Sequence, residues 1–264
     1  MTDLTLNDGR TIPQLGLGTY QVPDAQVATI VRAGLDAGFR LIDTAAIYHN
    51  ERGVGEGLGH DDAFITTKLW NDRHTDAAAA LDESLALLGR DAVDLYLIHW
   101  PHPSADDYVD AWRALVDLRE AGKARSIGVS NFMPEHLNRI IEATGVTPAV
   151  NQIELHPTFQ QRDCVAFNAD QGIVTQSWSP LGQGETLKDQ RITAIADRLG
   201  ATPAQVIIAW HLAKGYSVIP KTGNVDRLAS NFAANGVTLS SDDVSAIDAM
   251  DDANGRMGPD PATF

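Results

Sequence analysis

Short apolar runs alternate with amphipathic helical patterns through most of this 264-residue sequence. The apolar runs, each suited to a buried strand, begin near Leu15, Arg40, Ala63, Val93, Ala124, Ala149, Ile173 and Ser217. Helical patterns lie between or after them at 25–37, 51–58, 77–88, 108–121, 134–144, 162–171, 203–214 and 225–235. Most intervals between run starts suit one crossover helix between two parallel strands. This alternation predicts an α/β fold, a closed (β/α)8 TIM barrel.

Three further elements are predicted outside this alternation. An Asp-Gly turn at 8–9 lies between short runs at 4–6 and 11–13, which predicts an N-terminal β-hairpin at one end of the barrel. The long interval before Ser217 predicts an extra helix at 191–199. Another helix is predicted at 241–250, near the C-terminus, with Ser241 as its N-terminal cap. We expect residues 1–264 to form a single domain, because the sequence has no linker-like or low-complexity segment.

The composition argues against several classes of partner. The formal net charge is −15, whereas nucleic-acid-binding proteins carry a basic face. The sequence has no run of about 18 apolar residues and no signal-peptide pattern, so we expect no membrane partner and a cytoplasmic location. Cys164 is the only cysteine, which excludes an intrachain disulfide and fits a reducing compartment. No feature indicates an obligate protein partner.

Polar residues stand at or just beyond the C-terminal ends of three successive predicted strands. Asp43 follows Leu-Ile, with Tyr48 on the next loop, while Lys68 and His99 end the next two runs. Barrel active sites lie at the C-terminal ends of the strands, so these four side chains are expected to meet at one mouth. Taken singly, each residue has a structural explanation. Tyr48 could pack against the core, Asp43 could cap a helix, and His99 could be a buried histidine with hydrogen-bond partners. Their shared placement favours a catalytic set.

The four groups suit proton donation to a carbonyl that is being reduced. The ordinary pKa of tyrosine is about 10, and the nearby ammonium of Lys68 is expected to lower the pKa of Tyr48. Asp43 would hold Lys68 charged and in place, and neutral His99 would donate a hydrogen bond to the substrate oxygen. None of the four is a hydride source, so a cofactor is implied.

Seven motifs resemble those of the aldo-keto reductase superfamily, in the same order. They are D-T-A-A-I-Y-H-N-E at 43–51, I-T-T-K-L-W at 65–70, L-I-H-W-P at 97–101, G-V-S-N-F at 128–132, N-Q-I-E-L-H-P at 151–157, W-S-P-L-G at 178–182 and I-P-K-T at 219–222. Within the superfamily, the sequence is most similar to the bacterial branch that includes 2,5-diketo-D-gluconate reductases. The resemblance implies an NADPH-dependent oxidoreductase that reduces aldehydes or ketones to alcohols.

The resemblance also implies roles for individual residues. Tyr48 would be the general acid, assisted by Lys68 and Asp43, while His99 would orient the substrate. NADPH would bind in an extended form without a Rossmann fold, through Ser130, Asn131, Gln152, Trp178, Ser179, Leu181, Gly182, Lys221, Thr222, Arg227 and Asn231. Asn224 stands where many relatives have a basic residue near the 2′-phosphate, so NADH is the alternative cofactor.

The substrate pocket is predicted at the same mouth. Its expected wall residues are Tyr20, Ile47, Trp70, His99 and Trp100. Their aromatic character favours a compact, partly apolar or sugar-like carbonyl compound. The segment after Met250 is short and is expected to leave the pocket open. We expect no metal, because His99 and His102 have no third ligand residue nearby.

Two other hypotheses compete with carbonyl reduction. A barrel aldolase would form a Schiff base on Lys68 or Lys221, but that chemistry does not need the nicotinamide motifs. A non-catalytic sensor or accessory protein of the same fold would bind NADPH without turnover. The presence of Asp43, Tyr48, Lys68 and His99 together favours an enzyme.

Overall fold

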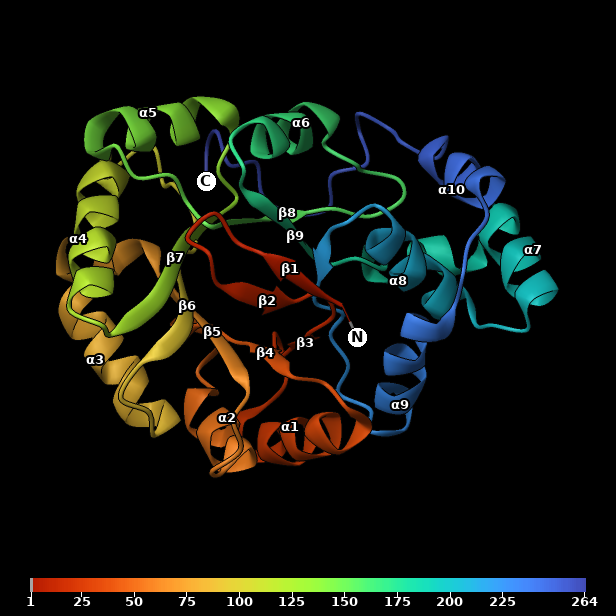
Figure 1. Cartoon of the computed structure of the whole chain (residues 1–264), viewed down its shortest axis with the longest axis horizontal. Helices are drawn as coiled ribbons and strands as arrows, with labels where there is room; N and C mark the ends of the chain where they lie inside the picture. Colours follow the sequence, from red (N-terminus) through yellow and green to blue (C-terminus); the bar gives the residue numbers. More distant parts are fainter. Residues whose placement is uncertain (1) are drawn as a thin grey trace.

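The structure of the protein, a computed structural model, describes residues 2–264, so Met1 of the predicted domain lies outside the described residues. Eight strands in this part of the chain form one parallel sheet in the order β10-β9-β8-β7-β6-β5-β4-β3 (Figure 1). The strands are β3 (Leu17–Gly18), β4 (Leu41–Asp43), β5 (Phe64–Leu69), β6 (Val93–Ile98), β7 (Ala124–Ser130), β8 (Val150–Glu154), β9 (Val174–Trp178) and β10 (Ser217–Val218). All eight predicted strands are therefore confirmed.

Backbone contacts join the first and last strands of this sheet. Parallel bridges pair Leu15 with Val218 and Gly18 with Lys221. Gly16 N donates to the Val218 carbonyl over 2.9 Å, and Gly18 N donates to that of Pro220 over 3.2 Å. These bonds close the sheet, which confirms the predicted (β/α)8 barrel.

Helices surround the barrel at nearly the predicted positions (Figure 1). They are α1 (Asp24–Ala37), α2 (Glu51–Leu58), α3 (Ala77–Leu88), α4 (Tyr108–Glu120), α5 (Pro134–Thr144), α6 (Arg162–Asp170), α8 (Pro203–Ala213) and α9 (Asp226–Phe232). The two extra helices, α7 (Gln190–Leu199) and α10 (Ser241–Asp248), are also confirmed. The predicted cap of α10 was wrong by one residue, because Ser240 and not Ser241 accepts the hydrogen bond from Asp243 N.

The alternation of side chains along β6 explains how the barrel is filled. Leu95 and Leu97 belong to a buried cluster inside the barrel, whereas Tyr96 and Ile98 pack outward with the helices. Parallel strands covered on both faces need such continuous apolar runs. Lys68 pairs in register with Leu97, so the ammonium side chain shares the inward face.

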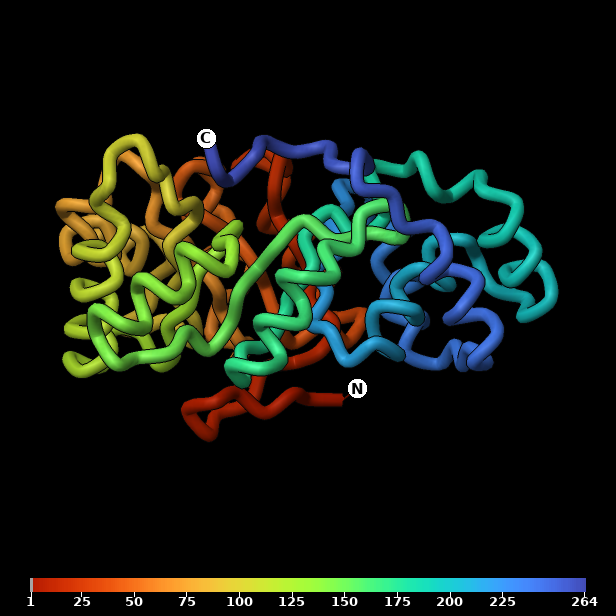
Figure 2. Tube along the Cα trace, turned by 90° about the horizontal axis from the view of Figure 1, so that it is seen from above, coloured from red at the N-terminus to blue at the C-terminus, as the bar shows by residue number. Residues whose placement is uncertain are grey.

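The N-terminal hairpin covers one end of the barrel. Strands β1 (Asp3–Thr5) and β2 (Thr11–Pro13) pair antiparallel, as predicted. Leu6 and Ile12 join the interior cluster of Leu95 and Leu97. Figure 2 shows the hairpin at one end of the molecule and the segment after α10 crossing the other. In residues 2–264, no helix has the length and apolar character needed to cross a membrane.

Candidate active site

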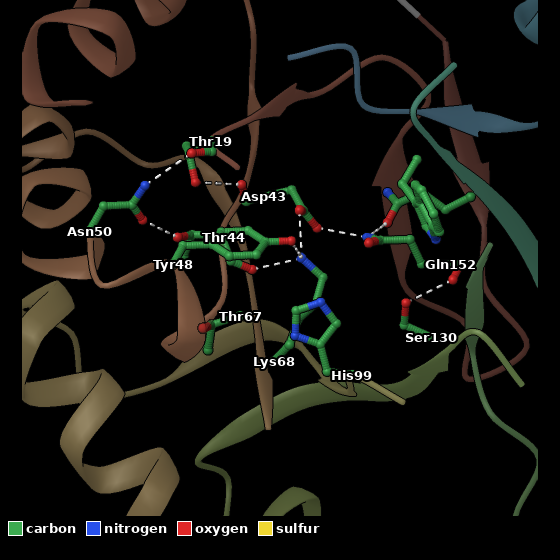
Figure 3. Close-up of polar contacts among 12 residues, drawn as sticks. Thr19, Asp43, Thr44, Tyr48, Asn50, Thr67, Lys68, His99, Ser130 and Gln152 are labelled. Carbon is green, nitrogen blue, oxygen red and sulfur yellow. Dashed lines mark hydrogen bonds and ion pairs between the residues drawn. The ribbon is translucent and has the colours of Figure 1, made fainter. Parts of the chain in front are cut away.

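Lys68 lies at the centre of a buried hydrogen-bond network at the barrel mouth (Figure 3). Its Nζ donates to Asp43 Oδ1 over 2.6 Å, to the Thr44 carbonyl over 2.8 Å and to Tyr48 Oη over 3.4 Å. An ammonium carries three hydrogens, so each of them has its own acceptor. Lys68 is 0% exposed and Asp43 2%. Three of the four predicted catalytic residues therefore meet directly.

Asp43 and Lys68 compensate each other's charge. Burial raises the pKa of Asp43 and lowers that of Lys68, while their direct contact favours the charged form of each group. The 2.6 Å distance and the two further acceptors of Nζ support a charged pair.

The environment of Tyr48 differs from the sequence-based expectation. Burial, followed by the charges of Asp43 and Tyr20, raises the pKa of Tyr48 well above its ordinary value. The prediction of a lowered pKa for Tyr48 beside Lys68 was therefore wrong. The reason is that desolvation of the buried phenol, together with the carboxylate of Asp43, outweighs any attraction to the ammonium. Tyr48 is a protonated phenol whose oxygen accepts from Lys68, so its own hydrogen points elsewhere.

His99 follows β6 and lies beside Tyr48, as predicted. Its ring centroid is 5.7 Å from that of Tyr48 and 5.1 Å from that of Trp70. Burial, and then the charge of Lys68, lowers the pKa of His99 well below its ordinary value. The imidazole is therefore neutral and can donate one N–H.

The first group of cofactor candidates forms a connected set at the ends of β7, β8 and β9. Ser130 Oγ donates to the Gln152 carbonyl over 2.8 Å, and Asn131 Nδ2 donates to Ser130 Oγ over 3.0 Å. Trp178 Nε1 donates to Asn131 Oδ1 over 2.8 Å. These side chains present hydroxyl, amide and aromatic groups beside the network of Lys68.

Gln152 connects this set to the catalytic candidates. Its Nε2 donates to Asp43 Oδ2 over 2.7 Å and to Gln176 Oε1 over 2.6 Å, and Gln176 Nε2 donates to Ser217 Oγ over 2.9 Å. Sequence reasoning missed Gln176. Its signal is a polar residue two positions before Trp178 on a buried strand, where side chains share one face.

The second group of candidates lies on the loop after β9. Ser179 and Gly182 both have positive φ, 48° and 52°, and Gly182 N donates to the Ser179 carbonyl over 2.9 Å. Leu181 between them is half-buried. This tight turn leads into the 3-10 segment η3 (Gly182–Lys188). The turn follows a strand end, which places it at the mouth.

The third group lies on the segment that leads from β10 into α9. Lys221 and Arg227 are exposed, with Arg227 in the first turn of α9. Thr222 is buried, and its Oγ1 accepts from Asn224 N over 3.1 Å. Asn231 is buried one turn further along α9. The segment thus presents two cations to solvent on a short, internally hydrogen-bonded turn.

The predicted pocket residues surround the catalytic candidates. Tyr20 is 54% exposed, and its ring centroid lies 5.1 Å from that of Tyr48. Ile47 lies next to Tyr48 in the 3-10 turn η1 (Ala46–Tyr48). The rings of Trp100 and Trp178 are 6.5 Å apart. The aromatic wall therefore connects the two predicted subsites.

Phe264 is an aromatic neighbour of the predicted pocket residues that sequence reasoning missed. Its ring lies 4.7 Å from that of Trp100 and 6.4 Å from that of Trp70. The expectation that the segment after Met250 leaves the pocket open was wrong, because that segment returns to the mouth. A short tail without helical or strand periodicity carries no sequence signal of where it will lie.

Comparisons with known proteins agree with this arrangement. The family model described as Aldo/keto reductase family matches residues 14–252. An aldo-keto reductase of Mycolicibacterium smegmatis is 51% identical, covering 99% of this chain and 97% of the relative. Methylglyoxal reductase DkgA of Escherichia coli strain K12 is 47% identical, covering 100% and 98%.

Solved structures show the same similarity. Gox0644 in its apoform has a TM-score of 0.97 at 51% identity, covering 98% of this chain and 97% of that one. A mutant of Gox0644 in complex with NADPH has a TM-score of 0.98 at 50% identity, covering 100% and 98%. The family match and these full-length similarities show that the chain belongs to the aldo/keto reductase family of oxidoreductases.

Proposed function

We propose that this protein reduces small aldehydes and ketones to alcohols with NADPH, and that Tyr48 donates the proton. The observation that carries the proposal is the buried ammonium of Lys68, shared among Asp43, Thr44 and Tyr48, with neutral His99 beside it. The names of two similar proteins add support, since DkgA is a methylglyoxal reductase and Gox0644 was crystallised with NADPH. We infer that residues 1–264 act as one catalytic unit, because the site draws on β4 to β10 of one sheet.

The residues at the mouth fit the chemistry of NADPH, which supplies the hydride when bound. The hydroxyl of Ser130 and the amides of Asn131 and Gln152 suit a neutral carboxamide, which both donates and accepts hydrogen bonds. Trp178 offers a ring face for stacking. The turn at Ser179, Leu181 and Gly182 lies at the mouth, and its backbone N–H groups other than that of Gly182, which bonds the Ser179 carbonyl, suit pyrophosphate. Lys221 and Arg227 suit a phosphate, with Thr222 and Asn231 beside them.

The preference for NADPH over NADH rests on those two exposed cations, since neutral Asn224 adds no charge. We expect a lower Kd for NADPH, measured by titrating the tryptophan fluorescence with each nucleotide. Equal affinities would contradict the preference.

Each catalytic candidate has a distinct task in this proposal. Tyr48 stays protonated until the carbonyl oxygen gains negative charge, because its pKa is raised. The Lys68 hydrogen directed at Oη stabilises the negative charge left on the phenol oxygen. Asp43 keeps Lys68 charged, and His99 Nε2 donates a hydrogen bond that orients the carbonyl.

The same geometry argues against a Schiff base on Lys68 and against the sensor hypothesis. A Schiff-base lysine must be neutral to attack a carbonyl, whereas Lys68 is held as an ammonium by Asp43. A sensor that only binds NADPH would not need a buried ion pair beneath a tyrosine hydroxyl.

The test compares NADPH oxidation by the wild type and by Tyr48→Phe, with methylglyoxal, keto-sugars and aryl ketones as substrates. We expect kcat to fall about 10²–10⁴-fold, the usual contribution of a general acid, while the Kd of NADPH stays within a few-fold. Tyr216→Phe removes a hydroxyl near Trp210, outside the site, and should keep wild-type turnover. Near-wild-type turnover in Tyr48→Phe would refute the acid role.

A further inference from the structure

Glu154 is a buried carboxylate that the chemistry proposed above does not use. It ends β8 and is 1% exposed. Its Oε1 accepts from Met257 N over 2.7 Å and from His156 Nε2 over 3.2 Å, and its Oε2 accepts from Gly258 N over 3.0 Å. A buried carboxylate is unfavourable unless such donors compensate it. These bonds fix the 255–264 segment to the barrel.

The backbone of this segment lies in direct contact with the barrel mouth. A Cβ added at Gly258 would lie 2.5 Å from Cη2 of Trp178, and one at Gly255 would overlap the Thr158 carbonyl. The Arg256 guanidinium lies 4.8 Å from the ring centroid of Phe159. Glycine is therefore required at two positions for the close approach, and the segment touches an aromatic side chain assigned above to the cofactor.

Beyond Gly258 the segment reaches the substrate side of the mouth. Phe264 packs on Trp100 and Trp70, and Trp70 in turn packs on His99. One anchored segment thus contacts both the proposed cofactor aromatic and the aromatic wall of the pocket. Figure 2 shows it crossing the end of the barrel opposite the hairpin.

We propose that Glu154 is a positioning residue that fixes the 255–264 segment, so that Phe264 limits the pocket to compact carbonyl substrates. This inference rests on the proposed carbonyl reductase function. Glu154 touches neither substrate nor cofactor in this role, and it acts through the backbone N–H groups of Met257 and Gly258.

The charge of Glu154 suits an anchor. Burial alone would raise its pKa, but the hydrogen bonds from His156, Met257 N and Gly258 N bring the pKa below its ordinary value. The carboxylate is therefore ionised at neutral pH and accepts from all three donors. Glutamine at this position has the same size but only one acceptor oxygen, so its NH₂ group would face at least one donor.

The test measures kcat/KM for methylglyoxal and for a bulky aryl ketone in the wild type, Glu154→Gln, Phe264→Ala and the double variant. We expect kcat/KM for the bulky ketone, divided by kcat/KM for methylglyoxal, to rise about tenfold in each single variant, which is a usual effect of altered pocket size. The double variant should show no further rise, because both changes remove the same wall. A loss of structure alone would lower both values together and leave the ratio unchanged.

A second readout does not depend on turnover. Arg256 is a trypsin site within the anchored segment, and mass spectrometry should detect cleavage there about tenfold faster in Glu154→Gln than in the wild type. Glu142→Gln makes the same charge change at an exposed position on α5 and should alter neither readout.

The outcomes separate the two proposals. Turnover with an unchanged substrate ratio in Glu154→Gln, or an additive rise in the double variant, would overturn the role of Glu154 alone. Absence of carbonyl reduction in the wild type would overturn the proposed function and, with it, the assignment of the pocket.

Discussion

At the scale of single residues, the site depends on how each hydrogen of one ammonium is used. Lys68 gives one to Asp43, one to Thr44 and one to Tyr48. The types and strand-end positions of these residues were predictable, because apolar runs that end in a polar residue are visible in the sequence. The raised pKa of Tyr48 was not predictable, because it depends on how completely the fold buries the phenol and then on the charge of Asp43 nearby.

Lys68→Met should destabilise the fold by about 3–5 kcal/mol, because it leaves the buried carboxylate of Asp43 without its partner. Urea unfolding of the cofactor-free protein measures this free energy. Adding Asp43→Asn should recover part of the loss, since the second change removes the unpaired charge. A double variant less stable than Lys68→Met would contradict this account.

At the scale of elements, local sequence signals predicted the bounds of most helices to within a few residues. Helices α3 and α5 begin and end at the predicted residues, and α8 begins at the predicted Pro203. Proline suits the first helical turn, where the backbone N–H has no partner. The error at α10 was local too. Ser240 and Ser241 are neighbouring serines, and either suits an N-cap by residue type. Only the backbone conformation decides which of them caps the helix.

Ser240→Ala should lower the free energy of unfolding by about 1 kcal/mol, the usual value of an N-cap hydrogen bond. Ser240 Oγ accepts from Asp243 N over 3.2 Å, and Ser240 N donates to Asp243 Oδ2 over 2.9 Å. Ser241→Ala is the matched control and should change stability by less than about 0.5 kcal/mol. Thermal unfolding distinguishes the two, and equal losses would rule out the assigned cap.

At the scale of the whole molecule, buried neutral histidines link stability to pH. His211 on α8 is fully buried, and its Nε2 lies 3.2 Å from the Pro180 carbonyl on the loop after β9. Burial lowers the pKa of His211 to about 3. In the unfolded chain its pKa is about 6.5, so the unfolded state binds an extra proton between these values. Stability therefore falls as the pH drops from about 6.5 towards 3.

His211→Gln keeps a donor for the Pro180 carbonyl but does not titrate. The variant should lose less stability on acidification than the wild type, by about 1.4 kcal/mol per pH unit below pH 6.5. Urea unfolding at several pH values measures this difference. His60→Gln, at an exposed position, should retain the wild-type slope. Identical slopes for the wild type and His211→Gln would contradict burial as the cause.

The sequence by itself determined the barrel, the strand ends and the candidate residues, because periodicity, turns and motifs act over a few neighbouring residues. Only the tertiary structure decided which residues far apart in the sequence form hydrogen bonds with each other. Gln152 bonds Asp43 across 109 positions, and Glu154 bonds Met257 across 103. Such contacts depend on strand register and on how the barrel closes, which no local pattern encodes. The same reason explains Phe264, whose contacts with Trp70 and Trp100 depend on the path of the segment before it.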